Sequence, residues 1–516
     1  MNTPESFSAH IAGGYTFAGD AILLGAGMLD GETFPDAPVR VPLGTLNRHG
    51  LIAGATGTGK TKTLQKLAEG LSSAGTPVLL MDVKGDLGGL AHPGLPNPHI
   101  DRRHAAIGQP WKPVAFPVEF LSISEEPGTR LRATVSEFGP VLLSKILGIN
   151  ETQSGVVSVV FKYCDDHRLP LLDLKDLKKT LQYVTGDGKS EFENEYGRVS
   201  TATTGSILRK IVEIEQEGAD LFFGERSFDV EDLMAIDDQG RGAINILQLG
   251  DIQGKPRMFS TFMLCLLAEV YATLPETGDT GQPALVIFLD EAHLLFQEAS
   301  RTLLEQIETI VKLIRSKGVG IVFCTQQPTD IPPGVLSQLG MKIQHALRAF
   351  TAQDRKALKA TAENYPLSPF YTTDELLTSL GTGEALITVL NDRGAPTPLV
   401  HTMLCAPESQ MGPLTQAEVL ATVDRSRLAA KYRENIDRES AYEILTAKIA
   451  DTRTAPSAPG AGRGPSHPVG TTSIGQMMNN PVARQVGTVV ARELTRGLLG
   501  VLGLGSTRRT RRTRLF

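Results

Sequence analysis

The chain has 516 residues, of which 41% are apolar and 21% charged, a composition typical of a protein with a sizeable buried core and roughly two or three domains. Its net charge of −6 gives no overall positive field for nucleic acid, so any such binding must use local basic patches. Four widely spaced cysteines predict neither a disulfide framework nor a zinc site. Apolar runs long enough to predict a membrane helix do not occur, and we expect a cytoplasmic protein.

Residues 1–45 combine glycine and proline with short apolar runs, which predicts a β-rich segment of two or three short strands. An α/β core is then expected over 46–135 and 239–410. His49, just before the first strand of this core, is expected to have a structural role rather than to act as a catalytic base.

The most informative stretch of the sequence is the glycine-rich segment 54–61. It follows the apolar run 51–53 and leads into apolar residues at helical spacing, which predicts a strand, a loop and a helix. The pattern G-x-x-x-x-G-K-[ST] lets backbone N–H groups converge on phosphate, with Lys60 reaching the β- and γ-phosphates and the Thr61 hydroxyl binding Mg²⁺. The alternative is an ordinary glycine-rich turn. The expected nucleotide-binding residues of this loop are Gly54, Thr56, Gly57, Thr58, Gly59, Lys60 and Thr61.

Residues 77–82 form a continuous apolar run that ends in Asp82, as expected for a strand buried on both faces of a parallel sheet. The following loop would emerge at the carboxyl edge of the sheet, where ligands bind. Asp82 and Asp86 are therefore candidates to orient Mg²⁺-bound water. The alternative for Asp86 is a helix cap.

Residues 136–238 change to helical periodicity and predict a helical insertion in the core. A capping box begins at Asn150, and a further helix is expected at about 201–217. We expect this insertion to determine specificity more than chemistry.

A second apolar strand, 284–289, runs directly into Asp290 and Glu291. Asp290 is expected to hold Mg²⁺ through water, and Glu291 to polarise the water that attacks the nucleotide. Adjacent residues on a strand point to opposite faces, but at the frayed carboxyl end of a strand both side chains can turn towards the phosphates.

The next strand, 319–324, is followed by Gln326 and preceded by a helix that ends near Arg315. Gln326 is expected to sense the γ-phosphate, and the alternative is a capping amide. Arg315 is either a finger that reaches the nucleotide of a neighbouring subunit or a solvated arginine at a helix end.

Further strands are expected at 342–347 and 384–390, followed by a helical extension at 411–452 and a flexible linker at 453–473. The tail at 474–516 is amphipathic, and from Arg484 onward it holds eight arginines and one glutamate, a local charge of +7. It is expected to bind nucleic acid, to lie on an anionic membrane, or to dock on this protein or a partner.

These segments together resemble an additional-strand, catalytic-glutamate P-loop NTPase. More narrowly, the chain is similar to the HerA/FtsK superfamily, and within it to the bacterial HerA-like proteins of the DUF853 type. The residues that carry the resemblance are 47–61, 81–86, 288–293 and 324–328.

The resemblance implies a RecA-like core, ATP and Mg²⁺ as cofactors, a hexameric ring of identical subunits, and DNA moved through its pore. By position, Arg315 matches the family's arginine beside a Lys-Gly turn, which favours the inter-subunit finger. HerA itself carries an N-terminal β-barrel, whereas 53 residues precede segment 54–61 here, only about enough for a remnant. A nucleotide-gated scaffold is the alternative to a DNA motor, and a motor acting on polypeptide or on a secretion assembly is a third possibility.

Overall fold

The computed structural model describes residues 3–252, 254–278, 280–297, 301–349, 351–434, 436 and 438–454. The chain forms two compact units: unit 1 comprises Met1–Arg132 and Arg226–Asn435, and unit 2 comprises Ala133–Glu225 and Ile436–Phe516. The predicted linker and arginine-rich tail fall almost entirely on residues 455–516, which lie outside the described residues.

Unit 1 is built on a large, mostly parallel sheet. Within the described residues its strands form one 12-stranded sheet in the order β2-β1-β12-β11-β10-β3-β9-β8-β4-β7-β5-β6. Neighbouring strands are parallel from β10 to β6 and antiparallel from β2 to β10. The expected α/β fold class is thereby confirmed. The strands are β1 Ala21–Leu29, β2 Glu32–Pro42, β3 Gly50–Ala53, β4 Val78–Asp82, β5 Val118–Ser122, β6 Thr129–Arg130, β7 Ile244–Gln248, β8 Leu285–Leu289, β9 Val319–Thr325, β10 Met341–Gln344, β11 Glu384–Thr388 and β12 Val400–Leu404.

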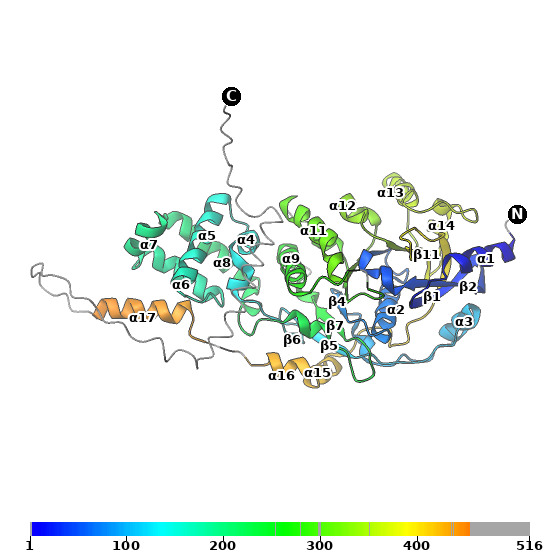
Figure 1. Ribbon diagram of the computed structural model, residues 1–516, viewed down its shortest axis with the longest axis horizontal. Helices are drawn as coiled ribbons and strands as arrows, with labels where there is room; N and C mark the ends of the chain where they lie inside the picture. The colour runs from blue at the N-terminus through cyan, green and yellow to red at the C-terminus, as the bar shows by residue number, and fades with distance from the viewer. Residues whose placement is uncertain are drawn as a thin grey trace, which may run out of the picture. The chain divides into compact units, whose positions relative to one another are not determined.

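Helices pack around this sheet, and in the view of Figure 1 α11 and α12 lie on one side of the strands and α15 and α16 on the other. The α-helices of unit 1 are α1 Pro4–Gly14, α2 Lys60–Ser73, α3 Pro98–Ile107, α9 Pro256–Thr273, α10 His293–Phe296, α11 Arg301–Ile314, α12 Pro333–Leu336, α13 Ala352–Ala362, α14 Thr373–Ser379, α15 Gln416–Asp424 and α16 Arg427–Tyr432.

The central strands are buried on both faces, as their continuous apolar runs predict. Every residue of β4, β8 and β9 is buried. On one face, Leu64 and Leu67 of α2 share an apolar cluster with alternate residues of β4, Val78 and Leu80. This period of two is the consequence of the pleat, and the cluster fixes α2 against the strands whose ends carry the site.

The order of the central strands decides which loops meet. β9 lies between β3 and β8, as the resemblance implied. Ala53 pairs with Thr325, Phe323 with Leu289, and Met81 with Leu289. The loops after β3, β9, β8 and β4 therefore leave the sheet at one carboxyl edge, which is where ligands bind in parallel sheets.

The prediction for residues 1–45 was incomplete. A helix, α1, begins at Pro4 after a capping box between Thr3 and Ser6. The two strands that follow are nine and eleven residues long and join the main sheet. Their turn is Asp30-Gly31, with φ of 49° and 84°, and an Asp-Gly pair is the sequence signal for such a hairpin.

Other boundaries also differ from the prediction. β10 ends at Gln344 and β11 at Thr388, and the helix expected to end near Arg315 is α11, Arg301–Ile314. β5, β6 and β12 were not predicted, because polar residues such as Glu119, Arg130 and His401 interrupt the continuous apolar run that marks β4 and β8.

Unit 2 is helical in the residues that the structure describes, and it includes the helix predicted at 201–217; its first segment ends at Glu225, so 226–238 of the predicted helical insertion belong to unit 1. A capping box begins α5 at Asn150 as expected. The C-terminal helix packs on α6, where buried Asp176 accepts hydrogen bonds from the Ser440 hydroxyl and from the backbone N–H of Tyr442. The helices are α4 Val135–Ile146, α5 Glu151–Asp166, α6 Leu174–Thr185, α7 Lys189–Tyr196, α8 Thr201–Gln216 and α17 Ala441–Thr454.

The region expected to be one helical extension, 411–452, is divided between the units: α15 and α16 belong to unit 1 and α17 to unit 2. Among the described helices, none combines the length and apolar character needed to cross a bilayer.

Candidate nucleotide-binding site

The loop from Gly54 to Thr61 connects β3 to α2 and adopts a conformation that only glycine adopts readily. Gly54, Gly57 and Gly59 have φ of 153°, 80° and 114°, in the region that disfavours residues with a Cβ. A Cβ on Gly54 would also lie 2.5 Å from the Cβ of His345. Thr56 and Gly57 are exposed at the tip of the loop. The backbone is therefore open to an anion, next to the N-terminus of α2, where the helix dipole favours negative charge.

Lys60 folds back over this loop. Its side chain is buried, and Nζ donates hydrogen bonds to the carbonyl oxygens of Gly54 at 2.6 Å and Ala55 at 3.2 Å. Burial lowers the pKa of the ammonium, and the charge of Lys84 lowers it further, whereas Glu291 and Asp290 raise it. Phosphate oxygens are stronger acceptors than carbonyl oxygens, so Lys60 is held where a bound phosphate would attract it.

The loop is supported from behind by residues that no motif predicted. The Ala55 N–H donates to the carbonyl of Ala346 at 2.9 Å, and the Gly383 N–H donates to the carbonyl of Thr58 at 3.0 Å. His345 is fully buried against the loop, its Nε2 2.9 Å from the Thr63 hydroxyl. Burial lowers the pKa of His345 to about 4, so the ring is neutral near pH 7 and adds no charge to the site.

Asp290 ends the apolar run of β8 and is 4% exposed. Within the described residues its Oδ2 is buried and accepts no hydrogen bond. Burial raises the pKa of Asp290 to about 7; Lys84 opposes this shift and Glu291 adds to it. A buried carboxylate oxygen without a donor is costly, and a divalent cation or its bound water would satisfy it. The Thr61 hydroxyl, in the first turn of α2, is the second candidate oxygen ligand, so these residues fit the expected Mg²⁺.

Glu291 turns towards the same edge through an unusual backbone conformation. Its φ is +47°, which costs a residue with a side chain about 1–3 kcal/mol and is enriched at functional sites. One carboxylate oxygen forms an ion pair with Lys84, and the other lies 3.1 Å from Nδ1 of His293. This turn of the backbone allows two consecutive side chains to lie at the same edge of the sheet.

Asp82 and Asp86, the two candidates to orient Mg²⁺-bound water, have different surroundings. Asp82 is buried and accepts hydrogen bonds from the N–H groups of Gly85 at 2.7 Å and Leu87 at 3.1 Å. It therefore shapes its own loop. Asp86 caps no helix, because the helical turn that follows has Leu87 at its N-cap without a side-chain hydrogen bond. Its Oδ1 is buried without a partner among the described residues, and Asp86 remains a candidate for orienting metal-bound water.

Gln326 is the first residue after β9 and is exposed at the carboxyl edge. The N-cap residue of the short helical turn that follows is Gln327, whose backbone N–H donates to the Asp330 carboxylate at 3.0 Å. Gln326 is thus not the N-cap residue of this turn, and its assignment as a γ-phosphate sensor stays a prediction.

Arg315 lies in a 3-10 turn, Arg315–Lys317, before β9 begins. The strand between this turn and Gln326 has seven residues, about 23 Å of extended chain. Arg315 is thus at the amino edge of the sheet, opposite the loop of its own subunit. Its assignment as an inter-subunit finger stays a prediction, as does the alternative of a solvated arginine at a helix end.

His49 has a structural position, as expected. It is 2% exposed, its Nε2 lies 2.7 Å from the carbonyl of Val311, and its Nδ1 accepts the Ile321 N–H at 3.0 Å. Burial lowers its pKa to about 4. These contacts join α11 and β9 to the start of the phosphate-loop strand.

Sequence reasoning assigned no role to Lys84, His293 or His345. The sequence pattern could have identified Lys84. It follows a buried strand that ends in a carboxylate, so it had to emerge at the carboxyl edge of the sheet. His293 follows Glu291 by two residues and offered only its proximity. His345 had no signal, because its contact with Thr63 joins residues far apart in the chain.

Comparison with known proteins gives the family. The family model described as "Helicase HerA-like C-terminal" matches residues 28–509. The chain belongs to the HerA-like helicase family. This HerA-like chain is 24% identical over 363 residues to the DNA double-strand break repair helicase HerA of Sulfolobus acidocaldarius, a match that covers 68% of this chain and 64% of that relative. It is 25% identical over 370 residues to the protein of the same name from Sulfurisphaera tokodaii, with the same coverage.

The HerA-like chain thus matches 64% of the length of these curated relatives. Among solved structures, the plasmid coupling protein TrwB in complex with ADP and Mg²⁺ aligns with a TM-score of 0.49 at 14% identity, covering 77% of this chain and 97% of TrwB. The resemblance drawn from the motifs is confirmed by the family match.

Proposed function

We propose that this protein is a Mg²⁺-dependent ATPase whose catalytic site lies at the carboxyl edge of β3, β8 and β9. The observation that carries this proposal is the buried oxygen of Asp290, which has no donor among the described residues and lies close enough to Lys60 for the two charges to interact. A phosphate loop next to a carboxylate in need of a cation is the combination that nucleotide hydrolysis uses.

In the proposed reaction, water attacks the γ-phosphorus, the bond from that phosphorus to the β–γ bridging oxygen breaks, and ADP and phosphate leave. The carboxylate of Glu291 accepts the proton of the attacking water. Lys60 leaves the carbonyl groups of its own loop for the β- and γ-phosphates. The Thr61 hydroxyl, and Asp290 through water, would hold Mg²⁺, which when bound would supply positive charge to neutralise the phosphates.

Lys84 positions Glu291 in this proposal. The ion pair between them is half-exposed on the lysine side and buried on the glutamate side. A γ-phosphate next to this pair offers Lys84 a second anion, so the lysine can release Glu291 when nucleotide is present. In the absence of nucleotide, the ammonium of Lys84 balances the buried carboxylate of Glu291.

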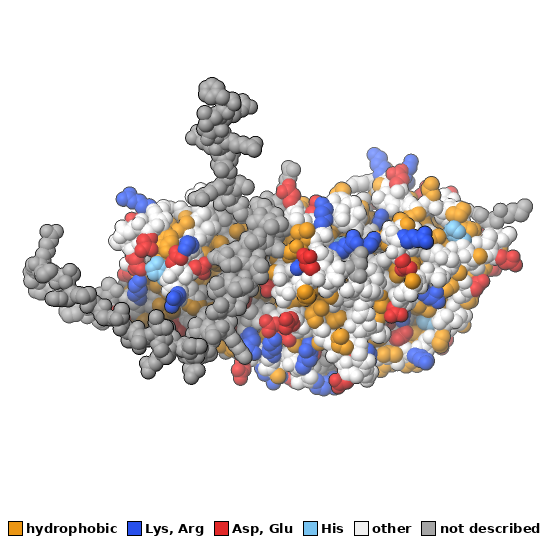
Figure 2. Space-filling model, viewed as in Figure 1, with side chains coloured by type: hydrophobic (Ala, Val, Ile, Leu, Met, Phe, Trp, Pro, Cys, Tyr) orange, Lys and Arg blue, Asp and Glu red, His pale blue; other side chains and the backbone are white. Residues whose placement is uncertain are grey.

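The proposed track is DNA, moved or unwound by a ring of identical subunits, six in number by the resemblance. The names of the curated relatives, DNA double-strand break repair helicases, support this choice. On the face in Figure 2, lysine and arginine (blue) are interspersed with aspartate and glutamate (red) over the described residues. DNA contact is therefore assigned to local groups rather than to a broad positive surface.

Steady-state ATP hydrolysis by the full-length protein tests the proposal. It is measured with and without single- and double-stranded DNA, at low and moderate salt, with Lys60→Ala and Glu291→Gln as blanks. Several-fold stimulation by DNA that weakens with salt is expected for a DNA motor. Hydrolysis unchanged by DNA would favour the nucleotide-gated scaffold, and hydrolysis equal in Lys60→Ala and wild type would contradict the site itself.

Arg315 is proposed to act on the nucleotide of the neighbouring subunit, with Gln326 sensing the γ-phosphate in its own. Arg315→Ala and Glu291→Gln subunits are each expected to be inactive alone. Mixing them creates interfaces that combine an intact Glu291 with an intact Arg315, so part of the activity should return. Mixtures that remain as inactive as either variant would remove the finger assignment.

A further inference from the structure

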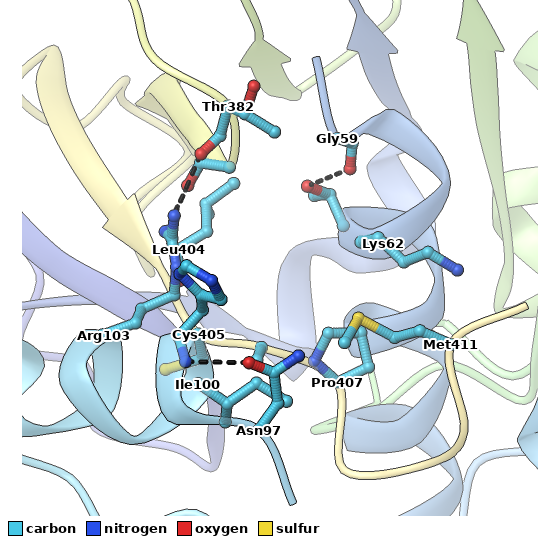
Figure 3. Close-up of a pocket in the computed structure, with 14 residues that line it drawn as sticks. Gly59, Lys62, Asn97, Ile100, Arg103, Thr382, Leu404, Cys405, Pro407 and Met411 are labelled. Atoms are coloured by element: carbon cyan, nitrogen blue, oxygen red, sulfur yellow. Dashed lines mark hydrogen bonds between the residues drawn. The ribbon is translucent and has the colours of Figure 1, made fainter. Parts of the chain in front are cut away.

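A cavity of about 200 Å³ begins where the phosphate loop ends. One wall is formed by Gly59, Lys62 and Thr63, at the start of α2. Figure 3 shows this wall facing Arg103 and Leu404 across open space, with Pro407 and Met411 near one end. A nucleotide with its phosphates in the loop would extend its sugar and base past the last glycine, so the cavity lies next to the bound phosphates.

The cavity lining suits a flat, largely apolar group. Ile100, Leu404, Pro407 and Met411 contribute apolar surface, and the exposed side chains of Asn97 and His99 lie at the start of α3. Met411 is 43% exposed, and its thioether is suited to contact an aromatic ring. Small-molecule sites combine such surfaces with a few polar groups that fix orientation.

The segment after β12 forms another wall of the cavity. Buried polar side chains of α2, the helix that follows the phosphate loop, form hydrogen bonds with this segment. Glu69 of α2 is 1% exposed and accepts hydrogen bonds from the N–H groups of Glu408 at 3.0 Å and Ser409 at 2.9 Å. Gln65 of α2, equally buried, donates to the carbonyl of Gln410 at 2.9 Å. Two buried polar residues on one helix thus bind three consecutive backbone groups, which keeps this wall in place.

Arg103 joins the remaining walls. Its guanidinium donates to the carbonyl oxygens of Thr382 and Gly383 at 2.9 Å and of Leu404 at 3.2 Å. Gly383 in turn donates its N–H to Thr58 of the phosphate loop. Because its guanidinium binds backbone carbonyls before β11 and at the end of β12, Arg103 holds these walls of the cavity together. The cavity is preformed, which lowers the cost of ordering a ligand in it.

We propose that this cavity binds the ribose and purine base of the nucleotide, and that the segment 404–411 is the part of the chain that contacts the nucleoside. This inference rests on the proposed function. It assigns a role to α3, to the loop before β11 and to the segment after β12, none of which belongs to the phosphate loop or to the Asp290-Glu291 pair.

The test compares two ligands on the full-length protein by calorimetry in the presence of Mg²⁺: ATP, and inorganic tripolyphosphate, which lacks the nucleoside. In Met411→Trp the indole fills the cavity, so the dissociation constant for ATP should rise about tenfold or more while that for tripolyphosphate stays unchanged. Leu420→Trp is the matched control, because Leu420 is 47% exposed on α15 and does not line the cavity. Unchanged ATP affinity in Met411→Trp would overturn the assignment.

The wild-type protein separates this inference from the proposed function. ATP binding no tighter than tripolyphosphate would overturn the nucleoside cavity alone, whereas failure to bind either ligand would overturn the proposed function and the cavity with it. An ATP analogue with a photoreactive azide on its adenine ring gives an independent readout. Crosslinks are expected in the peptides that contain 97–103 or 404–411, and labelling elsewhere would contradict the assignment.

Discussion

Two neighbouring strands of the sheet end in a carboxylate, but the two carboxylates have different surroundings. Asp82 ends β4 and accepts hydrogen bonds from the backbone N–H groups of Gly85 and Leu87. Asp290 follows β8, and its Oδ2 accepts none from the described residues. Both side chains are buried, and burial is the largest cause of both raised pKa values, about 6 for Asp82 and about 7 for Asp290.

This difference separates a structural carboxylate from a candidate functional one. Backbone donors allow Asp82 to stabilise its loop, and they occupy the lone pairs that a metal would need. Asp290 is buried without such donors, which is unfavourable unless something else binds there. The sequence pattern, an apolar run that ends in aspartate, is the same in both strands, so hydrogen-bond satisfaction tells them apart.

The largest effect on turnover is expected next to Asp290, at Glu291. Glu291→Gln keeps the shape of the side chain but removes the proton acceptor, so kcat should fall about 10²–10⁴-fold. Nucleotide affinity should be retained, because the phosphate loop is unchanged. Single-turnover hydrolysis and equilibrium binding measure the two effects separately, and normal turnover in this variant would exclude Glu291 as the base.

Asp290→Asn tests whether Asp290 helps to bind Mg²⁺. We expect Mg²⁺-dependent hydrolysis to fall about a hundredfold or more, because the amide is a poorer ligand for a hard cation. A titration of hydrolysis against Mg²⁺ concentration should show a weaker apparent affinity for the metal. Asp82→Asn is the matched control on the neighbouring strand. Equal losses in the two variants would mean that the two carboxylates do not differ as proposed.

Lys84 connects the two loops, since it follows β4 and pairs with the glutamate that follows β8. Lys84→Met keeps the length of the side chain and removes its charge, and kcat should fall about tenfold as Glu291 loses its partner. Lys112→Met, at an exposed position in the same unit, should leave kcat unchanged. A Lys84→Met protein with wild-type kcat would show that the ion pair has no part in turnover.

The smallest effect on turnover is expected at Asp82, where Asp82→Asn should change kcat by less than about twofold. Its effect should instead appear in stability. The folded pKa of about 6 is above the ordinary value of 3.8, so folding favours protonated Asp82, and this stabilisation is lost as pH rises through 6. The amide that replaces the carboxyl group in the variant does not titrate. The free energy of unfolding of the variant minus that of wild type should therefore rise by up to about 3 kcal/mol from pH 4 to pH 7.

Urea unfolding at the two pH values measures this difference directly. Subtracting the wild-type free energy of unfolding from that of the variant removes the contributions of the titrating groups that both proteins share. A difference that stays constant with pH would mean that Asp82 titrates alike in the folded and unfolded chains.

Much of the site was predictable because its signals are local. The phosphate loop depends on glycines at fixed spacing, and Asp290 and Glu291 directly follow a buried strand. Some predictions failed although the contacts concerned are also local, because loop conformations and helix caps leave no apolar periodicity in the sequence. Asp82 could not be told from Asp290 without knowing which backbone N–H groups surround it, and α1 was missed because its capping box lies within a stretch that otherwise resembles strands and turns.

The sequence by itself determined the strand, loop and helix that form the phosphate cradle, the carboxylate pair at the end of β8, and the parallel character of the central strands. Glycine conformations, apolar periodicity and strand-end polarity are properties of short stretches, so they can be read without a fold. Only the tertiary structure decided that Lys84 pairs with Glu291 and that Arg103 and Glu69 assemble a cavity beside the loop. Arg103 and Glu69 each contact residues several hundred positions away, and such contacts form only when the sheet brings those segments together.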